Sequence, residues 1–148
     1  MKKTLVLGIG NRLMMDDGIG VYVVEELCKK NTYPEACYIV GETDVGFCLQ
    51  QVGEASMVII VDAAYFGKES GDIYTLPIHE VLQCSQNTIS FHEFDLFKEL
   101  KIEGKSIEGI LIGIEPHEIN YGIQLSNVLQ DKFQDIVDKV ENIIKAGM

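Results

Sequence analysis

The sequence predicts an α/β domain in which helical layers cover both faces of a mainly parallel sheet. Three apolar runs support this, because a strand buried on both faces of a parallel sheet loses the usual alternation of apolar and polar residues. They are "TLVLGI", "MVIIVDA" and "GILIGIEP", at residues 4–9, 57–63 and 109–116. The 148 residues, 47% of them hydrophobic, fit one domain spanning 1–148, and a chain of this size buries about 70% of its unfolded surface.

The elements between these runs follow in order. Ile19–Lys30 repeats apolar residues at helical spacing and predicts the first helix. The β-rich segment Ala36–Gly41 predicts a second strand, and Phe47–Val52 a short helix. Gly71–Ile78 alternates and contains Pro77, which suits an edge strand because proline cannot donate a ladder hydrogen bond.

Two further helices complete the pattern. The first is expected over Glu93–Lys101. The second is long and amphipathic, with Ser126 as a plausible N-cap and Gly147 at its end. We find no internal repeat, low-complexity tract or linker, which favours one compact domain.

Charge and hydropathy exclude several kinds of partner. The net charge of −11 argues against nucleic acid and anionic membrane surfaces, since both attract basic proteins. No apolar stretch approaches the ~20 residues of a membrane span. The start "MKKTLVLGIGNR" has an apolar run no longer than a strand and no small-residue cleavage site, so we expect a cytoplasmic protein without a secretory signal. Four cysteines without CxxC spacing are expected to be reduced and mostly buried: Cys28, Cys37, Cys48 and Cys84.

The loop "GNRLMMDDGIG" places two acids after the first strand, and parallel sheets bind ligands at the carboxyl ends of their strands. A dinucleotide site is disfavoured, because Leu13 stands where the G-x-G-x-x-G fingerprint needs its third glycine. A helix cap explains one carboxylate of the pair Asp16 and Asp17. The second needs a cation or a proton if it points into the crevice. A plain cap and a metal or acid–base site both stay open.

Asp62 follows "MVIIV" and so ends a central strand beside the same loop. Glu42, at the end of the second strand, is a further acid at this edge, and His92 in "SFHEF" lies on a loop between elements. Two carboxylates and an imidazole make a workable site for a borderline divalent ion such as nickel or zinc. The other two histidines are expected to be structural or exposed: His79 and His117.

The stretch "LVLGIGNRLMMDDGIGVYVVEEL" resembles the N-terminal signature of the nickel–iron hydrogenase maturation endopeptidases, an apolar strand followed by G-x-G-N, D-[DE]-G-x-G and a helix. "IIVDA" resembles their second motif and "SFHEFDL" occupies the place of their histidine-containing third motif, at matching spacing. The resemblance implies a single three-layer α/β/α domain around a five-stranded, mostly parallel sheet. The implied activity is cleavage of a C-terminal extension from a hydrogenase large-subunit precursor after nickel insertion.

The resemblance also implies which side chains contact the metal. Matched residue by residue, they are Asp17, Asp62 and His92, while Asp16 caps or orients its neighbour. These three are the expected catalytic residues and ligands of nickel, which the precursor carries in, and the chain is expected to be a monomer. Either the metal polarises the scissile carbonyl or activates a water, or it only docks the precursor while an acid transfers the proton. No serine or cysteine beside a base indicates covalent catalysis.

The segment "VGETDVG" departs from the family, whose second strand often ends in Asp-Gly-Gly-Thr. This departure favours, as an alternative, a non-proteolytic nickel-checking or chaperone module that kept the three ligands. Asp17 stands where the family often has Glu, which shortens the side chain by one methylene and keeps the ligand type.

Overall fold

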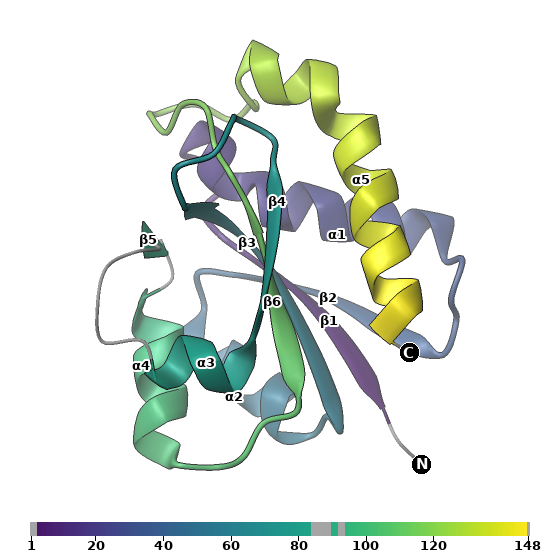
Figure 1. The fold of residues 1–148 in the computed structure, drawn as a ribbon, viewed down its shortest axis with the longest axis vertical. Coiled ribbons are helices and arrows are strands. Elements are labelled where there is room, and N and C mark those ends of the chain that lie inside the picture. The colour runs from purple at the N-terminus through teal and green to yellow at the C-terminus, as the bar shows by residue number, and fades with distance from the viewer. Residues whose placement is uncertain (1–2, 84–89, 92–93, 148) are drawn as a thin grey trace.

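The computed structural model describes residues 3–83, 90–91 and 94–147 and confirms the predicted α/β class. Five strands of the described chain form the main sheet (Figure 1), in the order β2 (Ala36–Glu42), β1 (Thr4–Ile9), β3 (Met57–Tyr65), β6 (Gly109–Ile114) and β4 (Ile73–Pro77). The first four are parallel, and β4 pairs antiparallel with β6 as the predicted edge strand. The two-residue β5 (Ser90–Phe91) pairs with the end of β3.

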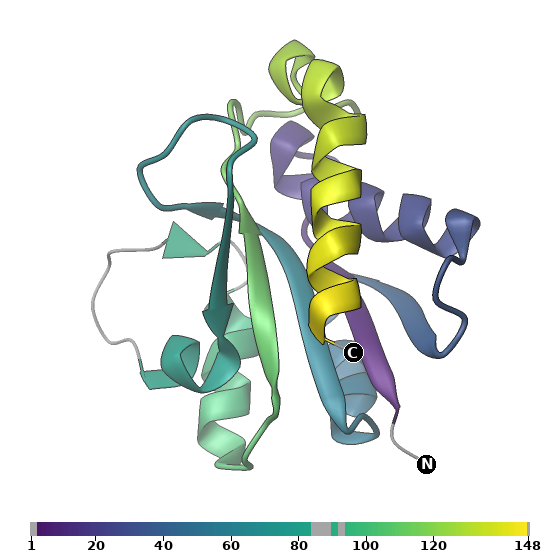
Figure 2. The same ribbon diagram turned by 45° about the vertical axis from the view of Figure 1, so that its right-hand side comes forward.

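Helices cover both faces of this sheet and confirm the three-layer arrangement (Figure 2). α1 and α5 pack on one face, and α2, α3 and α4 pack on the other. Their bounds are α1 Ile19–Lys30, α2 Val45–Gly53, α3 Ile78–Gln83, α4 Phe94–Glu103 and α5 Asn127–Gly147. A short 3-10 helix that the sequence did not predict, η1 (Met15–Gly18), precedes α1. None of the described helices is long and apolar enough to span a membrane.

Successive residues of the parallel strands enter opposite cores. In β1, Leu5 and Leu7 pack beneath α2, α3 and α4, whereas Val6 packs beneath α1 and α5. In β3, Ile60 packs beneath α2, α3 and α4, and Ile59 packs beneath α1 and α5. Because both faces of these strands are buried, their sequences read as continuous apolar runs.

The cysteine prediction is wrong in part. Cys28 is an exposed thiol in the last turn of α1, and Cys37 is half-buried in the edge strand β2. Cys48 packs in the core beneath the sheet, and Cys84 lies outside the described residues. A helix end and a sheet edge leave the first two positions partly open to solvent, which spacing alone does not indicate.

Gly20, in the first turn of α1, allows this helix to approach the sheet closely. A Cβ at Gly20 would collide with the carbonyl oxygen of Val61 and would lie 2.8 Å from that of Ile9. Both oxygens belong to the sheet backbone, which cannot move aside cheaply. The helix therefore begins directly over the ends of β1 and β3, and η1 contacts β3.

Replacing Gly20 with alanine is expected to lower the free energy of unfolding by about 2 kcal/mol or more, since overpacking typically costs ~1–3 kcal/mol. Urea denaturation measures the loss. Gly53→Ala in α2 is the matched control, because no atom lies within 4 Å of its added Cβ and alanine is a better helix residue there. Equal denaturation midpoints for the two variants would contradict the close approach of α1.

Candidate functional site

The candidate site lies at the carboxyl ends of β1 and β3, where the chain leaves β1 for η1. β1 pairs with β3 as far as Gly8 and Val61, so Asp62 is the first residue of β3 beyond this pairing. β3 continues to Tyr65, and Asp62 therefore lies inside a strand rather than after it. Asp16, Asp17 and Asp62 are all 0% exposed, so these carboxylates are enclosed rather than set in the open crevice that the sequence suggested.

Asp17 is held by the turn that precedes it. Its Oδ2 accepts a hydrogen bond of 2.8 Å from the backbone N–H of Asn11. Gly10 adopts a φ of +135° and passes so close to Asp17 that a Cβ would collide with the carbonyl oxygen of Asp17. Only glycine combines this conformation with this approach. The Gly-x-Gly-Asn segment therefore wraps around Asp17 and orients its carboxylate.

Asp16 binds a loop that is distant in sequence. Its Oδ2 accepts hydrogen bonds from the backbone N–H groups of His117 (2.9 Å) and Glu118 (2.8 Å). Ser126 donates twice at 2.7 Å, from its N–H to Oδ1 and from its hydroxyl to Oδ2. Four donors offset the cost of burying this charge. Asp16 thus fastens the loop of residues 117–126 to η1.

The structure does not support the alternative in which an acid of this pair caps the following helix. Neither η1 nor α1 has a side-chain hydrogen bond at its N-terminal cap. The capped helix is α5. The Oγ of Ser126 accepts from the N–H of Leu129 at 3.3 Å, and the same hydroxyl donates to Asp16. Ser126 is therefore the N-cap that the sequence predicted, and Asp16 lies near the positive end of the α5 dipole.

Asp17 and Asp62 bring two carboxylates from adjoining elements into the interior. Like charges in a desolvated space are compensated by a cation, a proton or hydrogen-bond donors. Carboxylates are ordinary ligands of divalent ions. His92, the third expected ligand, lies outside the described residues. Among residues 3–83, 90–91 and 94–147, no group of three or more histidine, cysteine, aspartate or glutamate side chains is placed to hold a metal ion.

The remaining candidates lie elsewhere. Glu42 is exposed, and its carboxylate pairs with Nε of Arg12 at 2.8 Å instead of joining the buried acids. His79 is exposed in α3, as predicted. His117 is exposed as well, and its Nδ1 lies 3.3 Å from the Oγ of Ser70, a contact that joins two surface loops.

Glu115, which sequence reasoning missed, is a further buried acid at this end of the sheet. It is 5% exposed, and its Oε1 accepts from the backbone N–H groups of Phe66 (3.0 Å) and Lys68 (3.1 Å). It thereby shapes the loop that follows β3. The available signal was an acid directly after an apolar run, the same signal that identified Asp62.

Tyr65, the last residue of β3, is a second residue near the buried acids that the sequence did not point to. Partial burial raises the pKa of its phenol, and the negative charges of Glu115, Asp17 and Asp16 raise that pKa further. The side chain is 45% exposed. Tyr65 is therefore a partly exposed phenol within electrostatic range of the buried acids.

Comparison with known proteins points to one family. A family model described as hydrogenase maturation protease matches residues 21–143. The chain is 28% identical to the hydrogenase 2 maturation protease of Escherichia coli, over 93% of this chain and 88% of that protein. It is also 28% identical to the hydrogenase expression/formation protein HoxM of Cupriavidus necator, over 95% of this chain and 73% of that protein.

Solved structures show the same fold. The hydrogenase maturating endopeptidase HybD from E. coli aligns with a TM-score of 0.77 and 26% identity, over 99% of this chain and 94% of that one. The [NiFe] hydrogenase maturation protease HybD from Thermococcus kodakarensis aligns with a TM-score of 0.73 and 25% identity, over 97% and 99% of the two chains. The α/β/α architecture inferred from the motifs is therefore confirmed.

Proposed function

Since the chain belongs to the hydrogenase maturation protease family, we propose that it is an endopeptidase that removes the C-terminal extension of a nickel–iron hydrogenase large-subunit precursor after nickel insertion. The observation that best supports this proposal is the complete burial of Asp17 and Asp62 on adjoining elements at the strand ends. Such a pair suits recognition of a cation that arrives with a substrate.

In this proposal Asp17, Asp62 and His92 contact the nickel that the precursor carries. Carboxylate oxygens and an imidazole nitrogen suit a borderline divalent ion. A bound metal of this kind supplies Lewis acidity to a nearby carbonyl or water. The chain contributes the fixed direction of Asp17, through Asn11 and Gly10, and the exclusion of solvent from both acids.

A cavity beside the turn that holds Asp17 gives a route for a polypeptide. It has a volume of about 500 Å³ and lies at the carboxyl ends of β1 and β2, between the turn of residues 10–13 and residues 40–44. Asn11, which donates to Asp17, is part of its wall. Leu13 and Phe47 add apolar surface that is 60% and 37% exposed. A peptide lying in this cavity would pass next to the turn that holds Asp17.

The departure of "VGETDVG" from the family pattern has structural explanations that do not involve the expected ligands. Glu42 pairs with Arg12, and Oδ1 of Asp44 caps α2 by accepting from the N–H of Phe47 at 3.0 Å. Neither acid replaces a member of the expected ligand set. The segment therefore lends less support to a non-proteolytic nickel-checking module than its sequence suggested.

Incubation of the chain with nickel-loaded and nickel-free precursor, followed by intact-mass measurement, tests the proposal. We expect the mass of the extension to be lost from the nickel-loaded precursor alone. Binding without loss of mass would support the nickel-checking alternative instead. Cleavage of both precursors at equal rates would refute the dependence on nickel.

A further inference from the structure

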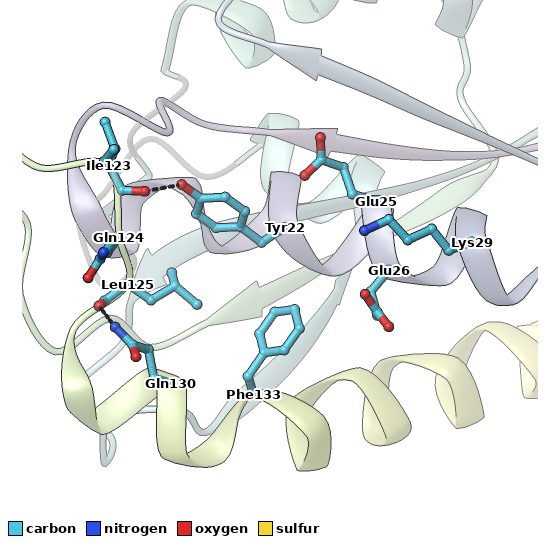
Figure 3. A pocket seen from close by; sticks show the side chains of 9 residues that line it. All are labelled: Tyr22, Glu25, Glu26, Lys29, Ile123, Gln124, Leu125, Gln130 and Phe133. Carbon is cyan, nitrogen blue, oxygen red and sulfur yellow. Dashed lines mark hydrogen bonds between the residues drawn. The ribbon is translucent and has the colours of Figure 1, made fainter.

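A surface pocket on the α1–α5 face has no role in the site described above. It has a volume of about 540 Å³ and is enclosed by α1, the segment of residues 123–125 and the first turns of α5 (Figure 3). We refer to it as the α1–α5 pocket. It is distinct from the cavity at the ends of β1 and β2, which shares none of its lining residues.

The lining of the α1–α5 pocket is partly apolar. Leu125 and Phe133 are half-buried and pack against the core between these helices and the sheet. Ile123 stands at the pocket with 72% of its surface exposed. Two more exposed apolar side chains lie near this segment: Tyr121 is 87% exposed, and Leu13, whose carbonyl accepts from the N–H of Gly122, is 60% exposed. Gathered apolar exposure of this kind typically marks an interaction surface.

Hydrogen bonds hold the pocket in shape. The hydroxyl of Tyr22 donates to the carbonyl oxygen of Ile123 at 2.8 Å, and Nε2 of Gln130 donates to that of Leu125 at 2.7 Å. Figure 3 shows both bonds bridging the 123–125 segment to a helix. A preformed pocket loses less conformational entropy when a partner binds.

Charged side chains of both signs line the α1 wall (Figure 3). Glu25 and Glu26 are half-buried there, and Lys29 is exposed on the same side of the helix. Glu25 is paired with Arg12 at 2.9 Å, whereas Glu26 makes no ion pair with any part of the chain that the structure describes. A carboxylate beside an apolar floor complements an apolar side chain flanked by a lysine or arginine. The net charge of −11 favours the same kind of partner.

The walls of the pocket continue into the segments that carry the buried acids. The Tyr22 hydroxyl also lies 3.4 Å from the carbonyl oxygen of Arg12, the neighbour of Asn11. Leu125 immediately precedes Ser126, which binds Asp16. A partner seated in the pocket therefore contacts the 123–125 segment directly and is linked to the turn of residues 10–13 only through Tyr22.

We propose that the α1–α5 pocket docks a segment of the hydrogenase precursor away from the bond that is cut, through an apolar side chain next to a lysine or arginine. This inference rests on the proposed function. Docking of this kind contributes equally to the ground state and the transition state, so its loss raises KM and leaves kcat unchanged.

Two surface substitutions test the docking without touching the core: Glu26→Lys reverses the unpaired wall charge, and Ile123→Ser removes the exposed apolar side chain. Matched controls on α4 are Glu99→Lys and Ile102→Ser, the latter at a side chain that is 67% exposed. KM and kcat for nickel-loaded precursor are measured by intact mass. Binding of the same precursor is measured separately by calorimetry.

Each pocket variant is expected to raise KM and the dissociation constant about five- to tenfold, as removal of an interface anchor does, while both controls match the wild type. Wild-type KM and affinity in both pocket variants would overturn the inference. A shift in the oligomeric state of the chain with an unchanged KM would also overturn it, in favour of a second copy. If the wild type binds the precursor without cutting it, the proposed function fails, yet weaker binding by the pocket variants still supports docking.

Discussion

Asp17→Asn is expected to reduce precursor cleavage by a factor on the order of 10³, within the range typical for loss of one catalytic group. The substitution removes a negative charge and keeps a carbonyl oxygen that can accept from the N–H of Asn11. The turn around Asp17 is therefore retained, and stability changes by no more than about 1–2 kcal/mol. Intact-mass kinetics and thermal unfolding separate the two effects.

The control for this experiment is Asp72→Asn. It makes the same chemical change at an exposed carboxylate that accepts one backbone N–H, that of Glu69, in the turn before β4. We expect that variant to process the precursor at the wild-type rate. Undiminished cleavage by Asp17→Asn would remove Asp17 from the proposed site, whereas equal losses in both variants would point to a general effect on folding.

Asp16→Ala is expected to be the most destabilising of the substitutions considered, by about 3 kcal/mol or more. It leaves the N–H and hydroxyl of Ser126 without their acceptor in a buried place, and each unsatisfied buried group costs ~1–3 kcal/mol. The amides of His117 and Glu118 lose a partner as well, but water can reach part of that region. Chemical denaturation measures the change.

Asp44→Ala provides the scale for comparison, because loss of a single helix cap costs about 1 kcal/mol. If Asp16→Ala costs no more than this, the four hydrogen bonds of Asp16 do not stabilise the fold in the way proposed. The two effects are expected to be additive in the double variant, since the carboxylates share no partner.

The layers of the fold could be predicted because local sequence reports burial. The runs at residues 4–9, 57–63 and 109–116 are apolar on both faces since both faces are covered. The ends of strands were harder to predict where a polar residue is buried inside the strand. An aspartate after an apolar run suggests the end of a strand, yet β3 continues past Asp62 to Tyr65.

The roles of the acids depended on contacts that local sequence does not report. The acceptor role of Asp16 requires donors 101, 102 and 110 residues away, so a neighbouring helix cap was the only local explanation. The prediction placed Glu42 at the correct edge of the sheet. Its pairing with Arg12, 30 residues earlier, could not be inferred from strand order. The sequence predicted that Asp17 and Asp62 lie near strand ends. It did not predict their complete burial, which depends on packing between elements distant in the sequence.

The bond between Asp16 and Ser126 has a consequence for how the protein matures. Its two ends are separated by 110 residues, and closure of so long a loop is entropically costly until α5 docks. During synthesis the first strands, Asp16 and Asp17 leave the ribosome well before Ser126, which carries the hydroxyl and amide that Asp16 requires. The loop of residues 117–126 can therefore be joined to η1 only after the start of α5 has been made, and we expect a partly synthesised chain to lack this closing contact.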